Sequence, residues 1–222
     1  MANGENNRDG SDNNWSWNSG VEGFSNKQDV IQNRNLRARA LMATLLLSFG
    51  TPMMLAGDEF LNTQFGNNNP YCQDNIISWI VWQAIGKNER NFVRYVRKLI
   101  KLRRRLSVFR KKHFFTGQKI EKSEFKDLAW YNEKGTEFIG ADWNNGKKKS
   151  ISYMAYSENG LLLTIFNAED TDKKWKLPSV KKAKKWKIVI DSSESLGSEV
   201  KLGSSKIIDV PAWSVVAIEI NI

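Results

Sequence analysis

The side chains best suited to chemistry lie in two short polar stretches. Asp58 and Glu59 follow a short apolar run and one glycine, and Asn68 and Asp74 lie in a second stretch that is rich in asparagine. Two carboxylates can serve as acid and nucleophile on one bond, but neighbouring residues of a strand point to opposite faces. Asp58 and Glu59 therefore cannot form such a pair. We expect them to cap the start of a loop or to accept hydrogen bonds beside a site.

The composition excludes several classes of site. The chain has 222 residues, of which 41% are apolar and nine are tryptophan, as is typical of a packed globular protein. The single cysteine, Cys72, allows no intramolecular disulfide and fits a reducing compartment. With one histidine, His113, and no cysteine cluster, a zinc-type site is excluded, and we expect no metal and no cofactor.

The basic charge has more than one interpretation. The formal net charge is +10, from 34 basic and 24 acidic residues. Such a charge could attract nucleic acid or an anionic membrane, but it more often reflects solvated helix and strand faces, and no nucleic-acid motif accompanies it. The longest apolar run, residues 40–56, is interrupted and falls short of the roughly 20 apolar residues that span a membrane. We expect neither a nucleic-acid nor a membrane partner.

Hydrophobic periodicity predicts the elements that position these residues. Residues 1–28 are expected to form a long loop, and residues 28–49 a helix. The apolar run at 53–56 predicts a short strand buried on both faces, as in a parallel sheet. A polar loop with a short helix near residues 76–82 should follow.

An amphipathic helix is predicted at residues 88–109. A basic amphipathic helix can bind a membrane surface, but an apolar stripe more often packs on a sheet. The residues expected in this stripe are Phe92, Val96, Leu99, Ile100, Leu106 and Phe109.

The pattern changes after residue 112, where we place a boundary between domains 1–112 and 113–222. Short β-rich runs alternate with turn signals, which predicts an antiparallel β-sandwich. The expected strands cover residues 128–131, 150–156, 161–166, 173–177, 186–190, 207–210 and 213–220.

Three blocks carry a resemblance to a known family. They are MANGENNRDG at residues 1–10, GTPMMLAGDEF at 50–60 and GNNNPYCQDNIISWIVW at 66–82. Together they resemble isoamylase-type glycogen debranching enzymes of glycoside hydrolase family 13, in which they lie in the last third of the chain. The segments DLAWY at 127–131 and DWNN at 142–145 continue the resemblance more weakly.

The resemblance implies a fold of α/β plus all-β type, the last part of a (β/α)8 barrel followed by an antiparallel β-sandwich. By analogy, residues 28–49 are barrel helix seven, residues 53–56 strand eight and residues 92–109 helix eight. A complete barrel needs roughly 250 residues, so this chain cannot hold one. Loops at the carboxyl ends of barrel strands build the active site, which places the polar loops on that side.

The resemblance implies hydrolysis of α-1,6 branch linkages in glycogen or a similar branched α-glucan. In the family a carboxylate nucleophile and a carboxylic acid act about 5–5.5 Å apart. They come from strands four, five and seven, whose motifs precede Met1, so we expect no catalytic residue here. Two positions depart from the family pattern: Ile76 and Val81 stand where the family tends to have acidic residues.

The resemblance suggests Trp15, Asp58, Glu59, Asn68 and Asp74 as substrate-binding candidates. Carboxylates and amides could bind sugar hydroxyls, and Trp15 could stack on a sugar ring. The alternative is structural, with the polar groups holding their own loops and tryptophan packing a long loop.

Three functional hypotheses follow from the resemblance. In the first, the chain is the carboxy-terminal part of a debranching enzyme and is inactive alone, because the catalytic carboxylates lie upstream. In the second, it is a subunit of a split enzyme completed by an upstream barrel polypeptide. In the third, it is a non-catalytic glucan-binding module. We expect residues 113–222 to be soluble alone and residues 1–112 not to be. A cytoplasmic location is expected, with a plastid as the alternative.

Overall fold

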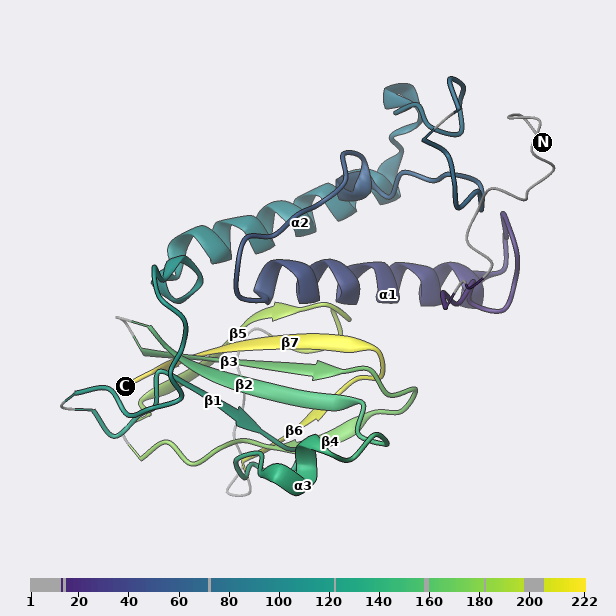
Figure 1. Ribbon diagram of the computed structural model, residues 1–222. Coiled ribbons are helices and arrows are strands. Elements are labelled where there is room, and N and C mark those ends of the chain that lie inside the picture. The colour runs from purple at the N-terminus through teal and green to yellow at the C-terminus, as the bar shows by residue number, and fades with distance from the viewer. Residues whose placement is uncertain are drawn as a thin grey trace. The chain divides into compact units, whose positions relative to one another are not determined.

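The computed structural model describes residues 13, 15–71, 73–121, 123–157, 160–181, 183–197 and 206–222. The first block of the resemblance, residues 1–10, and Cys72 lie outside these residues. Close contacts divide the chain into two compact units, residues 1–38 with 53–97 and residues 39–52 with 98–222. The boundary inferred at residue 112 remains a prediction, and both long helices contribute to both units (Figure 1).

The first unit contains helical turns and loops. It includes the first part of α1 (Gln28–Leu47), the short helices η1 (Asp58–Phe60) and η2 (Trp82–Ala84), and the first part of α2 (Lys87–Arg105). Turns and η2 replace the short helix predicted near residues 76–82.

Residues 53–56 do not form the predicted buried strand. Met53 is 89% exposed and Leu55 is 63% exposed. A strand buried on both faces needs hydrogen-bonded neighbours, and the described part of the first unit contains no strand to provide them. The apolar run therefore has no regular secondary structure and leaves the Met53 and Leu55 side chains exposed.

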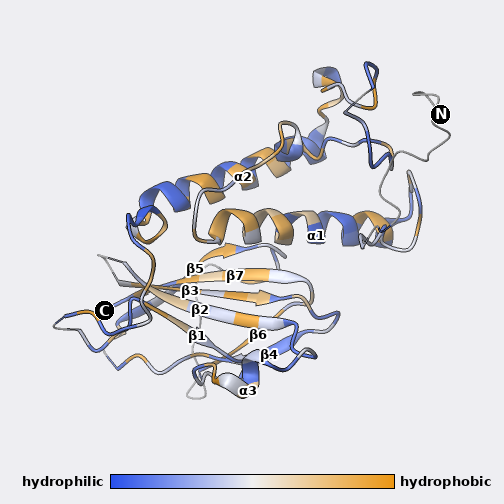
Figure 2. Cartoon of the chain, in the orientation of Figure 1, coloured by the Kyte–Doolittle hydropathy of each residue, from blue (hydrophilic) through white to orange (hydrophobic). Residues whose placement is uncertain are grey.

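Helix α2 is amphipathic as predicted and begins with a side-chain cap. The Glu89 carboxylate accepts a hydrogen bond from the Gly86 N–H at 2.8 Å. Figure 2 shows apolar and polar residues alternating along its ribbon. Ile100, expected in the apolar stripe, is 38% exposed, because Tyr95 and Leu102 continue the buried face at the helical period.

The second unit is built around a five-stranded antiparallel sheet with the order β1-β2-β3-β7-β5. A two-stranded sheet of β4 and β6 forms a second layer. Each predicted strand is present, and each of its ends lies within one residue of the prediction; the bounds are β1 Leu128–Tyr131, β2 Ser150–Ser157, β3 Gly160–Asn167, β4 Lys173–Lys176, β5 Lys185–Asp191, β6 Ile207–Val210 and β7 Ser214–Asn221.

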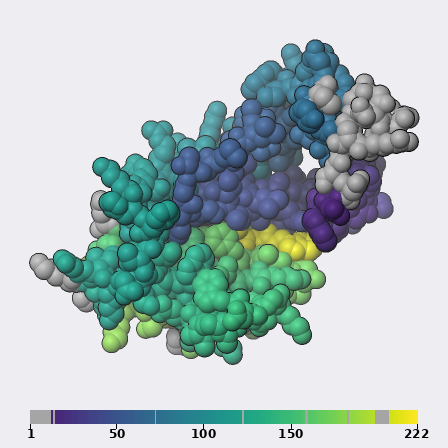
Figure 3. All heavy atoms as spheres, in the orientation of Figure 1, coloured from purple at the N-terminus to yellow at the C-terminus, as the bar shows by residue number. Residues whose placement is uncertain are grey.

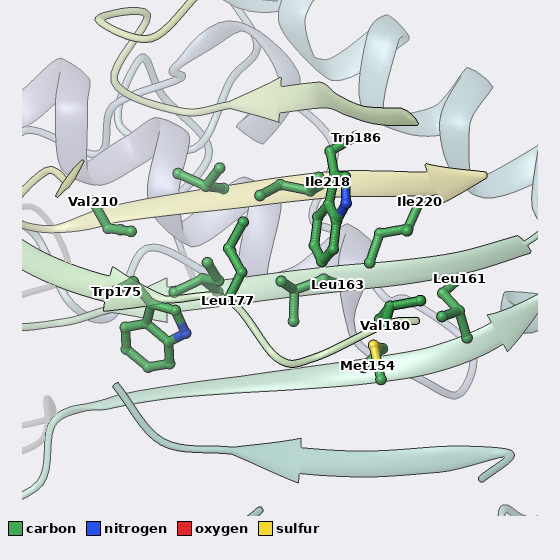
Figure 4. Close-up of a cluster of buried hydrophobic side chains, with 12 residues drawn as sticks. Met154, Leu161, Leu163, Trp175, Leu177, Val180, Trp186, Val210, Ile218 and Ile220 are labelled. Carbon is green, nitrogen blue, oxygen red and sulfur yellow. The ribbon is translucent and has the colours of Figure 1, made fainter. Parts of the chain in front are cut away.

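The main core of the second unit lies between these sheets (Figure 4). Trp175 of β4 and Val210 of β6 are fully buried together with Leu163 of β3 and Ile218 of β7. Leu163 and Ile218 are paired across β3 and β7, so they share one face of the large sheet. Because side chains alternate between the two faces of a strand, every second residue of β3 and β7 faces this core.

Helical segments of the second unit cover the opposite face of the large sheet. The buried Tyr153 hydroxyl of β2 donates a hydrogen bond to the Leu47 carbonyl at the end of α1, at 2.7 Å. The Tyr153 ring lies 4.8 Å from that of Phe49. On the same face, Leu162 and Ala217 are fully buried. Both faces of the large sheet are therefore closed to solvent at its centre.

The Arg103 side chain of α2 caps the carboxyl-terminal end of α1. Its guanidinium donates hydrogen bonds to the carbonyls of Leu46 at 2.8 Å, Ser48 at 2.7 Å and Gly50. The last carbonyls of a helix have no partner within the helix. Arg103 satisfies the Leu46 carbonyl in the last turn of α1 and the Ser48 and Gly50 carbonyls after it, so the ends of α1 and α2 stabilise each other.

Candidate functional site

The substrate-binding candidates all lie in the first unit, on loops around its helices. Trp15 lies in the loop before α1, Asp58 and Glu59 lie in η1, and Asn68 and Asp74 lie in the loop that leads to η2. Trp15 is 92% exposed, and Asp58, Asn68 and Asp74 are exposed as well. All but Glu59 are therefore largely accessible to a ligand.

The loop before α1 is fixed to that helix by two arginines. Arg34 donates hydrogen bonds to the carbonyls of Asn18 at 3.1 Å and Gly23 at 2.8 Å. The Arg37 guanidinium lies over the Trp17 ring, 4.5 Å from its centroid. The two tryptophans thus differ, since Trp17 packs on the helix whereas Trp15 projects from the loop.

The Glu59 carboxylate holds its own turn. It accepts a hydrogen bond from the Gly57 N–H at 2.8 Å. Gly57 has a φ of 101°, and a Cβ there would approach the Asn62 Cβ to 2.8 Å, so the turn requires glycine. This geometry is that of a loop-start cap, one of the two roles inferred from the sequence. Asp58, next to it, is exposed.

Asp74 also makes a local contact. Its carboxylate accepts a hydrogen bond from the Trp79 indole N–H at 2.9 Å. Nearby, the Asn67 side chain accepts from the Asn69 N–H at 2.8 Å, and Asn75 accepts from the Ile77 N–H at 2.9 Å. Such Asx turns shape the loop from within.

An apolar pocket of about 210 Å³ lies between these loops. The Phe60 ring stands 5.4 Å from the Trp82 ring at this point. The pocket is lined mostly by apolar side chains of η1, η2 and the loop between them; the lining residues are Phe60, Leu61, Asn62, Thr63, Phe65, Ile76, Val81, Ala84, Ile85 and Glu89.

Two features of the pocket stand out. Ile76 and Val81, the two departures from the family pattern, both line it. Leu61 and Phe65 have left-handed backbones with φ of 62° and 54°, a strained state for such side chains that clusters at functional sites. The sequence prediction missed this pocket, although spaced apolar residues in a polar loop were a signal for it.

Within the described part of the chain, the one charged side chain that lines the pocket, that of Glu89, has a local role, since its carboxylate is engaged with the Gly86 N–H. Among the described residues, no group of three or more His, Cys, Asp or Glu side chains could hold a metal ion. The described helices also include none with the length and apolar character to cross a membrane.

Solved structures define the class of the fold. A pullulanase from Bacillus acidopullulyticus aligns with a TM-score of 0.57 at 19% identity, over 88% of this chain and 21% of that one. The Group B Streptococcus pullulanase SAP, solved in complex with maltotetraose, aligns with a TM-score of 0.64 at 15% identity, over 86% of this chain and 28% of that one. The chain thus has the fold of one part of a pullulanase-type enzyme.

Curated relatives narrow this class. A glycogen operon protein GlgX homolog of Mycobacterium tuberculosis is 35% identical over 98% of this chain. A glycogen debranching enzyme of Salmonella gallinarum is 40% identical over 77% of it. These homologues confirm the resemblance to glycogen debranching enzymes that the motifs carried.

The chain spans only part of these relatives, 32% of the first and 24% of the second. No protein-family model matches it. The activity of the whole relatives is therefore a matter for proposal.

Proposed function

We propose that these 222 residues act as the carboxy-terminal part of an enzyme that hydrolyses α-1,6 branch linkages in glycogen-like glucans. The observation that carries the proposal is the 35% identity to a GlgX homolog over 98% of the chain. The exposed loops that bear Trp15, Asp58, Asn68 and Asp74 would contribute to glucan binding. Glu59 would hold the turn that presents Asp58.

We also propose that the 222 residues alone do not hydrolyse glucan. A retaining glycosidase needs two carboxyl groups about 5–5.5 Å apart across the scissile bond. The carboxylate contacts of the candidate loops serve other ends, with Glu59 capping a turn and Asp74 bonded to Trp79. The catalytic pair would come from preceding barrel strands.

A chimeric enzyme tests both proposals. The matched third of the GlgX homolog is replaced by these 222 residues, and release of reducing ends from glycogen is measured for the chimera, for the truncated homolog and for the chain alone. We expect release by the chimera only. A folded but inactive chimera would refute the first proposal, and release by the chain alone would refute the second.

A split enzyme is the second candidate, and one observation favours it. Met53 and Leu55 expose apolar surface where the relatives' remaining sequence could supply neighbouring strands. Mixing the chain with the separately purified truncated homolog tests this. Activity in the mixture would support assembly from two polypeptides, whereas activity of the covalent chimera alone would argue against it.

A further inference from the structure

A cluster of aromatic side chains on the second unit lies apart in sequence from the candidate loops. Trp143 ends the short helix α3 (Gly140–Trp143), which the sequence analysis did not predict. Its ring packs against Phe138 at 4.8 Å and edge-on against Trp130 at 5.8 Å, yet the residue remains 53% exposed. The segment around α3 lies at the surface of this unit in the space-filling view (Figure 3).

Polar contacts hold α3 in place. The Asp142 carboxylate accepts a hydrogen bond from the Ile139 N–H at 3.2 Å, closing the first turn. The same carboxylate pairs with the Lys148 ammonium at 3.1 Å, which also lies 3.3 Å from the Glu133 carboxylate. The Lys148 ammonium stands 5.5 Å from the Phe138 ring centroid. The aromatic and ionic contacts therefore converge on one small element.

This arrangement has the physical properties of a binding platform. A tryptophan presents a large amphipathic surface with few rotatable bonds, so ordering it on binding costs little conformational entropy. Contacts with Phe138, Trp130 and the capped turn restrict the Trp143 ring before a ligand arrives, which lowers this cost further. A tryptophan that serves packing alone is expected to be buried, as Trp175 is, whereas Trp143 is about half exposed.

We propose that Trp143 is a binding platform for the glucose rings of an α-glucan chain, distinct from the candidate loops of the first unit. The apolar face of a pyranose ring would stack on the indole, as apolar groups do on aromatic faces. The exposed Asn144 and Asn145 follow directly, and their amides can exchange hydrogen bonds with sugar hydroxyls. The choice of α-glucan as ligand rests on the proposed function, whereas the platform rests on its own geometry.

Binding of the full 222-residue chain to glycogen tests the proposal. The probe is glycogen in a cosedimentation assay at 0.15 M and 0.5 M NaCl, with dextran as the comparison polymer. We expect wild-type binding to persist at high salt, because stacking on a neutral polymer is not screened. Trp143→Ala should weaken binding roughly fivefold or more, and Trp143→Phe should retain part of it.

Phe114→Ala is the matched control, since Phe114 is an exposed aromatic residue of the same unit, with 99% exposure. This variant should bind as the wild type does. Equal binding by the Trp143→Ala and Phe114→Ala variants, with both folded by circular dichroism, would overturn the proposal. Binding that disappears at 0.5 M salt would also overturn it, because the basic surface would then explain the retention.

The two proposals can fail separately. The chimera could be active while the isolated 222-residue chain binds glycogen equally with and without the Trp143 indole. This result would refute the binding role of Trp143 and support the proposed enzymatic function. Glycogen binding that depends on Trp143, together with a folded but inactive chimera, would refute the proposed enzymatic function and support the binding role of Trp143.

Discussion

Asp127 shows how one buried carboxylate organises the approach to the large sheet. It accepts hydrogen bonds from the Thr116 N–H at 2.8 Å, the Gly117 N–H at 2.9 Å and the Thr116 hydroxyl at 3.2 Å. Burial opposes ionisation of this carboxyl, but the hydrogen bonds outweigh burial and lower the pKa of Asp127. The charged form is therefore the one that the fold stabilises.

A prediction about acid stability follows from this lowered pKa. The stabilisation from Asp127 should be complete above the unfolded-state pKa, about 3.9, and should be lost as the pH falls through the lower folded-state pKa. Asp127→Asn should cost about 1–3 kcal/mol of unfolding free energy at pH 7, and less below pH 4. Urea unfolding at both pH values measures this. Asp170→Asn, at an exposed position, is the control, and an equal effect of both substitutions would contradict the prediction.

The candidate residues show what the sequence could predict at this scale. A loop-start cap was one of the two roles inferred for Asp58 and Glu59, and in the structure Glu59 makes this contact. The difference between Trp15 and Trp17 could not be predicted, because it depends on Arg37 of a later helix. The platform at Trp143 was missed for the same reason, since Lys148 and Glu133 meet only after the strands pair.

At the scale of elements, the strands were predictable because each β-rich run is short and is bounded by turn signals. The segment at 53–56 was not, because its apolar run predicts a strand only if neighbouring strands exist. The four residues of α3 are too few to show a helical period. Local pattern was therefore sufficient for the strands and insufficient for the segment at 53–56 and for α3.

A second prediction concerns the contact between the end of α1 and the large sheet, at Tyr153. Burial raises the pKa of Tyr153 far above its ordinary value, so its hydroxyl remains a donor at neutral pH. Tyr153→Phe keeps the ring contacts but leaves the Leu47 carbonyl without this donor, and should cost about 1–3 kcal/mol in urea unfolding. Tyr156→Phe, at a half-buried position, should cost less. Equal costs would show that the hydrogen bond contributes little.

The same contact bears on the predicted solubility of residues 113–222. Cutting at residue 112 would remove the parts of α1 and α2 that belong to the second unit, including Arg105, which pairs with Glu219 of β7. We expect the isolated segment to fold with a lower unfolding free energy than the second unit has in the full chain, because the face that contains Leu162 and Ala217 would lose its cover.

At the scale of the whole molecule, the exposed apolar segment at 53–56 should govern solubility. Large exposed apolar side chains promote association. Met53 and Leu55 are 89% and 63% exposed, so replacing them removes little packing from the folded state. Met53→Gln with Leu55→Gln should raise the solubility limit of the chain and leave its unfolding midpoint unchanged.

The matched control replaces the exposed Trp15 by Gln. If that single change raises solubility as much as the double change does, any exposed apolar side chain has this effect and the prediction for the segment at 53–56 fails. In the chimera, the same double substitution should lower activity, because the segment would then lie among barrel strands.

The guanidinium of Arg103 has a consequence for the timing of local motion. Three carbonyls after and within the last turn of α1 depend on a side chain that belongs to α2. Fraying of one helix end should therefore release the other, and amide hydrogens of residues 44–50 and 102–106 should exchange with solvent at a common rate. Because an arginine stays charged at every physiological pH, lowering the pH should not separate the exchange rates of the two helix ends. A shorter side chain at this position should let the two ends exchange independently.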